Sequence, residues 1–178
     1  MQNKFFLVAE GCCNHCGDIE IAKKMIRSAA VRGIHYLKWQ KRTISSISDH
    51  IKNKPHPIPE NSYGKTYEEH RQNLEFSIEQ HRELKEYSEK HGIGYACSVW
   101  DIPSAKEIVG LDPDYIKIPS ALNLNKELIF WLLKNYSKKI HLSLGMLSPP
   151  QKDFLLQEIF KYKDYIRVSL PPPPSLFK

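Results

Sequence analysis

The sequence lacks any run of about 18 consecutive apolar residues, so it predicts no transmembrane helix and no membrane partner. Residues 1–10 also lack the length and the small-residue cleavage site of a signal peptide, and we therefore expect a cytoplasmic protein. Cysteine is scarce, with 4 residues in 178. In a reducing compartment we expect no disulfide framework.

Long blocks of one charge are also missing, although the formal net charge is +6. The lysines and arginines are scattered and do not alternate with aromatic residues in a basic stripe, so nucleic acid is not an expected partner. The positive excess is typical of a solvated surface, and it is also compatible with a preference for anionic substrates.

Short apolar segments alternate with helical ones, which is the pattern of β/α units around a parallel sheet. Strands are predicted at residues 5–9, 34–40, 95–99, 115–118, 140–143 and 165–169. Helices are predicted between Asp18 and Gly33 and at residues 67–90, 104–110, 125–135 and 151–162. Six strands form either an open doubly wound sheet or an incomplete (β/α) barrel, because a full barrel needs about 250 residues. No linker divides the chain, which predicts a single domain over residues 1–178.

Polar residues gather where the predicted strands end, and in parallel sheets function concentrates at those carboxyl ends. The set comprises Glu10, Lys38, Gln40, Ser98, Lys117, Ser120 and Ser143. Lys38 and Gln40 are two residues apart, so they share one side of a strand. Lysines and hydroxyls are suited to phosphate or carboxylate oxygens, which predicts an anion pocket. The alternative is that each lysine extends to solvent at a strand end.

A second cluster contains three thiols and an imidazole, at Cys12, Cys13, His15 and Cys16. Structural zinc sites usually need a second ligand pair at a distance, and none is present, so a plain loop is favoured. The remaining histidines considered are scattered and are predicted to lie mostly on the surface. They are His50, His56, His70, His81 and His91.

Several of these segments resemble the sialic acid synthase family. Residues 9–11 and 14–18 resemble its AEIGxNHxGD opening, and residues 38–42 resemble KFQKR. The later matches are residues 63–67, 69–71 and 74–76 with YGKTYGEHRxxLEF, 117–120 with KIPS, and 142–146 with LSTGM. The motifs occur in the family's order and span most of the chain.

The resemblance implies a TIM-type (β/α) barrel that condenses phosphoenolpyruvate with an N-acetyl amino sugar. The product would be a nine-carbon acidic sugar of the N-acetylneuraminate, legionaminate or pseudaminate kind. Glu10 would act as acid or base, and Gln40 would face the sugar with it. The phosphate and carboxylate of phosphoenolpyruvate would be held by Lys38, Ser98, Lys117, Ser120 and Ser143. A divalent manganese or magnesium ion would polarise the aldehyde and hold the water that adds.

The sequence departs from the family after the sixth predicted strand. Where relatives have a segment like HTTSEYP with a metal-ligating histidine, this chain has Ser169, Leu170, Pro171 and Pro172. We also expect this chain to lack the family's later metal histidine and its C-terminal antifreeze-like domain, and Leu144 stands where relatives have a threonine. We therefore expect a barrel of about six β/α units without the family's metal histidines, and no turnover by the chain alone.

Two other functions remain open at this point. One is a catalytically inactive barrel remnant that binds an anionic ligand or a partner chain. The other is an aldolase with Lys117 as a Schiff base, which the resemblance does not support. Six parallel strands leave two open edges, so the sequence also predicts a homo-oligomer.

Overall fold

Six parallel strands form one sheet whose spatial order follows the chain, from β1 to β6. The computed structural model describes residues 5–169. The strands are β1 (Val8–Cys12), β2 (Tyr36–Lys41), β3 (Gly94–Val99), β4 (Tyr115–Ile118), β5 (Lys139–Ser143) and β6 (Ile166–Ser169). A doubly wound sheet reverses its strand order at a switch point, whereas a (β/α) barrel does not. The incomplete barrel is therefore confirmed, and the doubly wound alternative is wrong.

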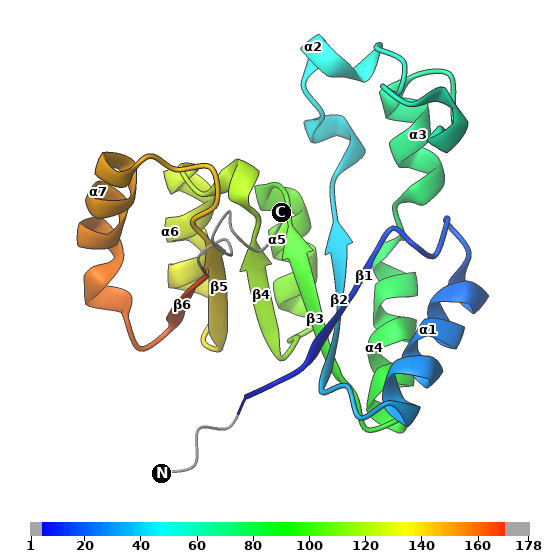
Figure 1. Cartoon of the computed structure of the whole chain (residues 1–178), viewed down its shortest axis with the longest axis horizontal. Coiled ribbons are helices and arrows are strands. Elements are labelled where there is room, and N and C mark those ends of the chain that lie inside the picture. Colours follow the sequence, from blue (N-terminus) through cyan, green and yellow to red (C-terminus); the bar gives the residue numbers. More distant parts are fainter. Residues whose placement is uncertain (1–4, 170–178) are drawn as a thin grey trace, which may run out of the picture.

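Most of the helices line the outer face of this sheet. The helices are α1 (Ile19–Val31), α2 (Asp49–Lys52), α3 (Tyr67–Leu74), α4 (Ile78–Lys90), α5 (Ile102–Gly110), α6 (Lys126–Asn135) and α7 (Pro149–Ile159). Short 3-10 turns are η1 (Ile44–Ser46), η2 (Pro59–Asn61), η3 (Ser120–Leu122) and η4 (Phe160–Tyr162). Figure 1 shows α2 and α3 beyond the end of β2, with α4 following directly below α3. Within residues 5–169, no helix is long and apolar enough to cross a membrane.

The hydrophobic core lies between the sheet and its helices. Alternate residues of each strand pack into it, because successive side chains point to opposite faces. They include Leu37, Trp39, Tyr95, Cys97, Val99, Ile116, Ile118, Ile140 and Leu142. The intervening residues face the inner, concave side of the partial barrel, and several of them are polar. This alternation places the candidate site residues on the inner face and separates them from the core.

The first helix begins and ends where the sequence predicts. A carboxylate oxygen of Asp18 accepts hydrogen bonds from the backbone nitrogens of Glu20 at 2.7 Å and Ile21 at 3.2 Å. These bonds satisfy amides that have no partner inside the helix. After the helix, Gly33 adopts a φ of 69°, a conformation that glycine tolerates best.

The single helix predicted over residues 67–90 is instead two helices, so that prediction is wrong. Ser77 starts α4 with a reciprocal cap: its Oγ accepts from the Gln80 nitrogen at 3.2 Å, and Gln80 Oε1 accepts from the Ser77 nitrogen at 2.9 Å. Just before it, Phe76 is buried and stacks on His15 with ring centroids 3.9 Å apart. The break is therefore held by a capping box and by a buried aromatic ring.

The first strand is displaced from its predicted position at residues 5–9. It occupies Val8–Cys12, so Glu10 lies inside the strand and not at its end. Phe5 and Phe6 are 77% and 57% exposed, because they lie beside the edge strand β1 and no further strand covers them within residues 5–169. The apolar run therefore marks an open edge of the partial barrel.

Other boundaries move by a few residues. The second strand runs Tyr36–Lys41 where residues 34–40 were predicted. The last helix begins earlier than predicted, at Pro149, because Ser148 caps it, and beyond Ile159 it tightens into the 3-10 turn η4.

Candidate active site

A buried lysine connects the first three strands on the inner face. Strand pairing sets Glu10 opposite Lys38. Lys38 Nζ donates to Glu10 Oε2 at 2.5 Å and to Ser98 Oγ at 3.2 Å. The Lys38 side chain is only 5% exposed, whereas that of Glu10 is 54% exposed. The alternative in which Lys38 extends to solvent is therefore wrong, because its ammonium is held inside by a carboxylate and a hydroxyl.

Lys117 lies on the neighbouring strand β4, close to the group formed by Lys38 and Ser98. Strand pairing sets it opposite Ser98, on the same face as Lys38. It is half-buried, and within residues 5–169 its ammonium makes no hydrogen bond or ion pair. Burial lowers the pKa of Lys117, and the charge of Lys38 lowers it further, while Glu10 opposes the shift. A second cation so close to Lys38 favours a bound anion that would separate the two charges.

Two serines complete the candidate site on the next strand and its neighbouring loop. Ser120 Oγ and Ser143 Oγ are 2.7 Å apart. The amide of Asn123 supports their loop by donating to the carbonyls of Ser143 at 3.1 Å and Gly145 at 2.8 Å. A Cβ on Gly145 would lie 2.7 Å from Ser120 Oγ, so only glycine leaves the hydroxyl pair undisturbed. Together they offer two hydroxyls to a ligand oxygen.

Strand register places these groups on one face. Gln40 aligns with Ser98, and Lys117 aligns with His141, which precedes Ser143 by two residues. Gln40 Nε2 donates to Cys13 Sγ at 2.5 Å, so this side chain leans toward the loop after β1. The candidate site thus has three parts. They are the hydrogen-bonded group around Lys38 on β1 to β3, the serine pair at β5 and the loop after β4, and Lys117 on β4 between them.

The charge state of Glu10 follows from its neighbours. Burial alone would raise the pKa of this carboxyl. The hydrogen bond and charge of Lys38, together with the charge of Lys117, outweigh burial and lower the pKa below its usual value. Glu10 is therefore ionised at neutral pH, and it can accept a proton but cannot donate one in this state.

Several residues near the site have no predicted role in the sequence. Arg42 and Arg71 both contact the buried carboxylate of Glu75, and Arg71 Nη2 also donates to Cys13 Sγ at 3.3 Å. They occur in the segments that carry the resemblance, which was the only available signal. His141 could have been found from spacing, because it lies two residues before Ser143 on a strand.

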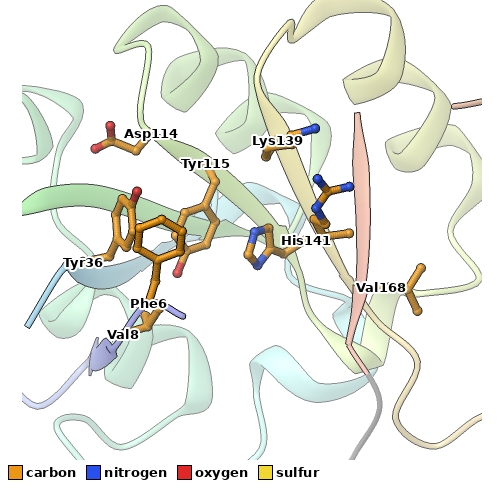
Figure 2. A pocket seen from close by; sticks show the side chains of 9 residues that line it. Phe6, Val8, Tyr36, Asp114, Tyr115, Lys139, His141 and Val168 are labelled. Carbon is orange, nitrogen blue, oxygen red and sulfur yellow. The ribbon is translucent and has the colours of Figure 1, made fainter. Parts of the chain in front are cut away.

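A cavity of about 540 Å³ occupies the opposite end of the inner face (Figure 2). It is lined by Phe6, Val8, Tyr36, Asp114, Tyr115, Lys139, His141, Arg167 and Val168. Tyr36, Tyr115 and Lys139 begin their strands, so this is the amino-terminal end of the sheet. Residues beside β1 and in β6 line the same cavity, which shows that the sheet curves and brings its two edges toward each other. The cavity is part of the barrel interior, separate from the polar cluster at the carboxyl ends.

The described residues do not fit a metal ion. Within residues 5–169, no group of three or more histidine, cysteine, aspartate or glutamate side chains could hold one. Cys12, Cys13 and Cys16 are free thiols. The predicted loss of the family's metal histidine concerns residues 169–172, and all but Ser169 lie outside the described residues.

Three histidines are internal. His15 is buried against Phe76, and burial lowers its pKa to about 4. His70 and His81 are also buried, so the prediction of a mostly surface set is wrong for these two. His81 contacts the Tyr95 hydroxyl at 2.6 Å, and burial lowers its pKa to about 3. These side chains are neutral at pH 7 and belong to the packing of α3, α4 and the β1 loop.

Comparison with known proteins places this geometry in a family. Residues 25–164 match the model of the NeuB family. N-acetylneuraminate-9-phosphate synthase from Homo sapiens is 36% identical over 120 residues, which are 67% of this chain and 33% of that protein. N,N'-diacetyllegionaminic acid synthase from Campylobacter jejuni is 31% identical over 144 residues, covering 80% of this chain and 43% of that one. The chain thus spans about a third of the first relative and somewhat less than half of the second.

A solved structure supports the fold independently. The N-acetylneuraminic acid synthetase of Leptospira borgpetersenii, in complex with citrate, superposes with a TM-score of 0.77 at 22% identity. The match covers 94% of this chain and 54% of that chain. Nearly the whole of this chain therefore adopts the arrangement found in part of that protein.

Proposed function

Because this chain belongs to the NeuB family, we propose that it forms the phosphoenolpyruvate-binding part of a sialic acid synthase. The reaction joins phosphoenolpyruvate to an N-acetyl amino sugar aldehyde and yields a nine-carbon acidic sugar and phosphate. The observation that carries this proposal is the inner-face cluster, in which Lys38 bridges Glu10 and Ser98 beside Lys117. The serine pair adds two hydroxyls on the adjacent strand.

The cluster suits a doubly anionic ligand. Two ammonium groups face one carboxylate, so the inner face carries an excess of positive charge at the carboxyl ends of the strands. Lys117 makes no ion pair within residues 5–169 and is ready to bind an oxygen. Hydrogen bonds that involve a charged group are stronger than neutral ones, which favours phosphate and carboxylate oxygens over neutral ligands.

Glu10 provides the proton transfer in this proposal. The free site holds it ionised through Lys38 and Lys117. When phosphoenolpyruvate binds, its negative charges compete for the same lysines, and the pKa of Glu10 must rise. Glu10 then takes up a proton that it can deliver to the aldehyde oxygen as this becomes a hydroxyl.

The bonds change in a defined order. The methylene carbon of phosphoenolpyruvate attacks the aldehyde carbon, and one carbon–carbon bond forms. Water then adds to the carbon that carries the phosphate, and the carbon–oxygen bond breaks to release phosphate. Lys38 and Lys117 stabilise the charge on the phosphate and carboxylate throughout, because they are fixed before the reaction begins.

Binding tests the proposal directly. Lys117→Met should weaken phosphoenolpyruvate binding about tenfold by titration calorimetry, which corresponds to about 1.4 kcal/mol. Lys126→Met is the matched control, because Lys126 pairs with Glu158 on the outer surface. Equal affinity of both variants would show that Lys117 takes no part in binding.

An inactive anion-binding remnant would share this binding result. It is supported by the absence of a metal-binding cluster within residues 5–169. Release of phosphate that depends on an added amino sugar separates the two functions, since a remnant would bind phosphoenolpyruvate and release none.

A further inference from the structure

The loop after β1 carries two thiols that line one cavity of about 510 Å³. Cys13 and Cys16 are separated by Asn14 and His15, a Cys-x-x-Cys spacing that is typical of redox-active pairs. They stand at the two unspecified positions of the AEIGxNHxGD motif, so the pair belongs to this chain and not to the resemblance. Cys16 is exposed and Cys13 is partly buried, so a small molecule can reach the pair.

A tight turn holds the two cysteines at a spacing that a disulfide can bridge. The Cys16 nitrogen donates to the Cys13 carbonyl at 3.0 Å, which closes a β-turn over residues 13–16. A β-turn brings its first and fourth Cα atoms within about 7 Å. Disulfides join Cα atoms about 4.4–6.8 Å apart, so closure needs rotation of the side chains and little movement of the backbone. Cys16 Sγ already bends back over the turn, 3.7 Å from the carbonyl oxygen of Asn14.

Packing fixes this turn on both sides. His15 is buried against Phe76, and its carbonyl accepts from the Asp18 nitrogen at 2.8 Å. Gly17 follows with a φ of 79°, and a Cβ there would collide with the carbonyl oxygen of Asn73. Because the two thiols are held near each other, their reaction is favoured over attack by a second thiol from solution.

Two hydrogen-bond donors converge on Cys13. Its Sγ accepts from Gln40 Nε2 at 2.5 Å and from Arg71 Nη2 at 3.3 Å. Sulfur accepts such bonds more strongly when it carries a negative charge, and the thiolate is the form that attacks in disulfide exchange. The surroundings of Cys13 therefore suit the second, resolving thiol of an exchange that begins at the exposed Cys16.

The other two cysteines are held as thiols at neutral pH. Burial raises the pKa of Cys12, and the Glu10 carboxylate 3.4 Å from its Sγ raises it further, while Lys38 opposes the shift. Cys97 lies fully buried in the core, and burial raises its pKa to about 12. A protonated thiol is a poor nucleophile, so exchange is confined to the other pair.

We propose that Cys13 and Cys16 form a reversible disulfide by exchange with a low-molecular-weight disulfide such as oxidised glutathione. The thiolate of Cys16 attacks one sulfur of that disulfide, forms a mixed disulfide and releases one glutathione thiolate. The thiolate of Cys13 then attacks Cys16 Sγ, closes the intramolecular bond and releases the second glutathione. The protein loses two electrons and two protons, which leave with the oxidant as two glutathione thiols.

Closing this bond would alter the candidate active site. Cys13 Sγ would turn toward Cys16, so Gln40 and Arg71 would lose it as an acceptor. Gln40 aligns with Ser98 across β2 and β3, and its amide would be free to turn into the inner face. The oxidation state of the pair would thereby set the position of a side chain in the candidate site.

Incubation of the reduced full chain in glutathione redox buffers, followed by acid quenching, alkylation and mass spectrometry, tests the proposal. The parent chain and the control Cys12→Ser should each lose two alkylatable thiols and gain an internal link within residues 13–16. Cys16→Ser should slow the loss of thiols about tenfold, because the exposed attacking thiol is gone. Cys13→Ser should instead accumulate glutathione on Cys16, because the resolving thiol is gone. Dithiothreitol should restore all 4 thiols of the parent chain.

These outcomes do not depend on the proposed function. A link to Cys12, stable glutathione on Cys16, or no loss of thiols in the parent chain would refute the pairing. Mapping the parent chain needs no variant, so a substitution that fails to fold leaves the test intact. The side-chain amide NMR signal of Gln40, assigned by its absence in Gln40→Glu, should shift on oxidation. An unchanged signal would show that the disulfide does not reach the candidate site.

Discussion

Removing the Glu10 carboxylate should tighten the binding of inorganic phosphate and not weaken it. In the free site, Glu10 accepts a 2.5 Å hydrogen bond from Lys38 and faces Lys117. An incoming phosphate must take over these cations and also approach a carboxylate of its own sign. Glu10→Gln keeps the size of the side chain and a hydrogen-bond acceptor for Lys38, while it removes the opposing charge.

The size of the effect follows from two estimates. Two unit charges about 5 Å apart interact by about 3 kcal/mol at an effective dielectric of about 20. The Glu10 side chain is 54% exposed, so solvent screens much of this repulsion. We therefore expect a gain of about 1–2 kcal/mol, which is about 5–30-fold in affinity. The free variant should also be less stable, because the buried Lys38 ammonium loses its counter-charge.

Calorimetry with inorganic phosphate at low ionic strength measures the affinity, and the phosphate-induced rise in melting temperature measures the linked stabilisation. Both should be larger for Glu10→Gln than for the parent chain. Glu20→Gln is the matched control, because it removes a carboxylate that pairs with Lys23 on the outer helix α1. Weaker phosphate binding by a folded Glu10→Gln variant would refute the charge argument.

Three further predictions concern the rest of the molecule. Gly145→Ala should weaken phosphate binding several-fold, because its Cβ would lie 2.7 Å from the hydroxyl oxygen of Ser120. Gly110→Ala is the control, because a Cβ there would meet no atom within 4 Å. Equal phosphate affinities of the two variants by calorimetry would contradict this prediction. Stability in urea should fall as the pH drops from about 6.5 towards 4, by about 2–3 kcal/mol for each of His15 and His81, whose folded pKa values are about 4 and about 3. His81→Gln should remove about half of this loss, and an unchanged curve would exclude His81 as its source. Because β1 and β6 each pair with one neighbour within residues 5–169, we expect self-association by light scattering that Val8→Lys reduces; a monomer at tens of micromolar would contradict it.

The alternation of strands and helices could be predicted because it depends on local signals. Apolar runs, the Asp18 cap and Gly33 each act over a few residues, and these elements occur close to where they were expected. The order of the strands depends on contacts between distant segments, which composition does not encode. The break at Ser77 was missed because the run from Tyr67 to Lys90 contains no glycine or proline to mark it.

The candidate site could be predicted in outline for a related reason. The carboxyl ends of parallel strands lie at one edge of the sheet, so polar residues near those ends come together both in a barrel and in a doubly wound sheet. The strand-end pattern does not predict Arg42, Arg71 and Glu75. A charged residue on a polar helix such as Arg71 is normally assigned to solvent, and the structure buries it because α3 packs onto the loop that follows β1, where Arg71 contacts Cys13. Arg42 follows β2 and Glu75 follows α3, and their pairing depends on the same packing.

In the proposed function, the charge balance of the site would link substrate binding to proton transfer. In the free state, Glu10 occupies the place of an anion: it holds Lys38 in the interior, where an unpaired ammonium would be costly. In the proposed function, phosphoenolpyruvate would take over that role with its own oxygens and would release the carboxylate from its ion pair. A carboxylate that loses its cation and gains an anionic neighbour takes up a proton more readily. Under the proposed function, the site would therefore acquire its acid only once phosphoenolpyruvate is bound, and an amino sugar that arrives first would meet an ionised Glu10 with no proton to give.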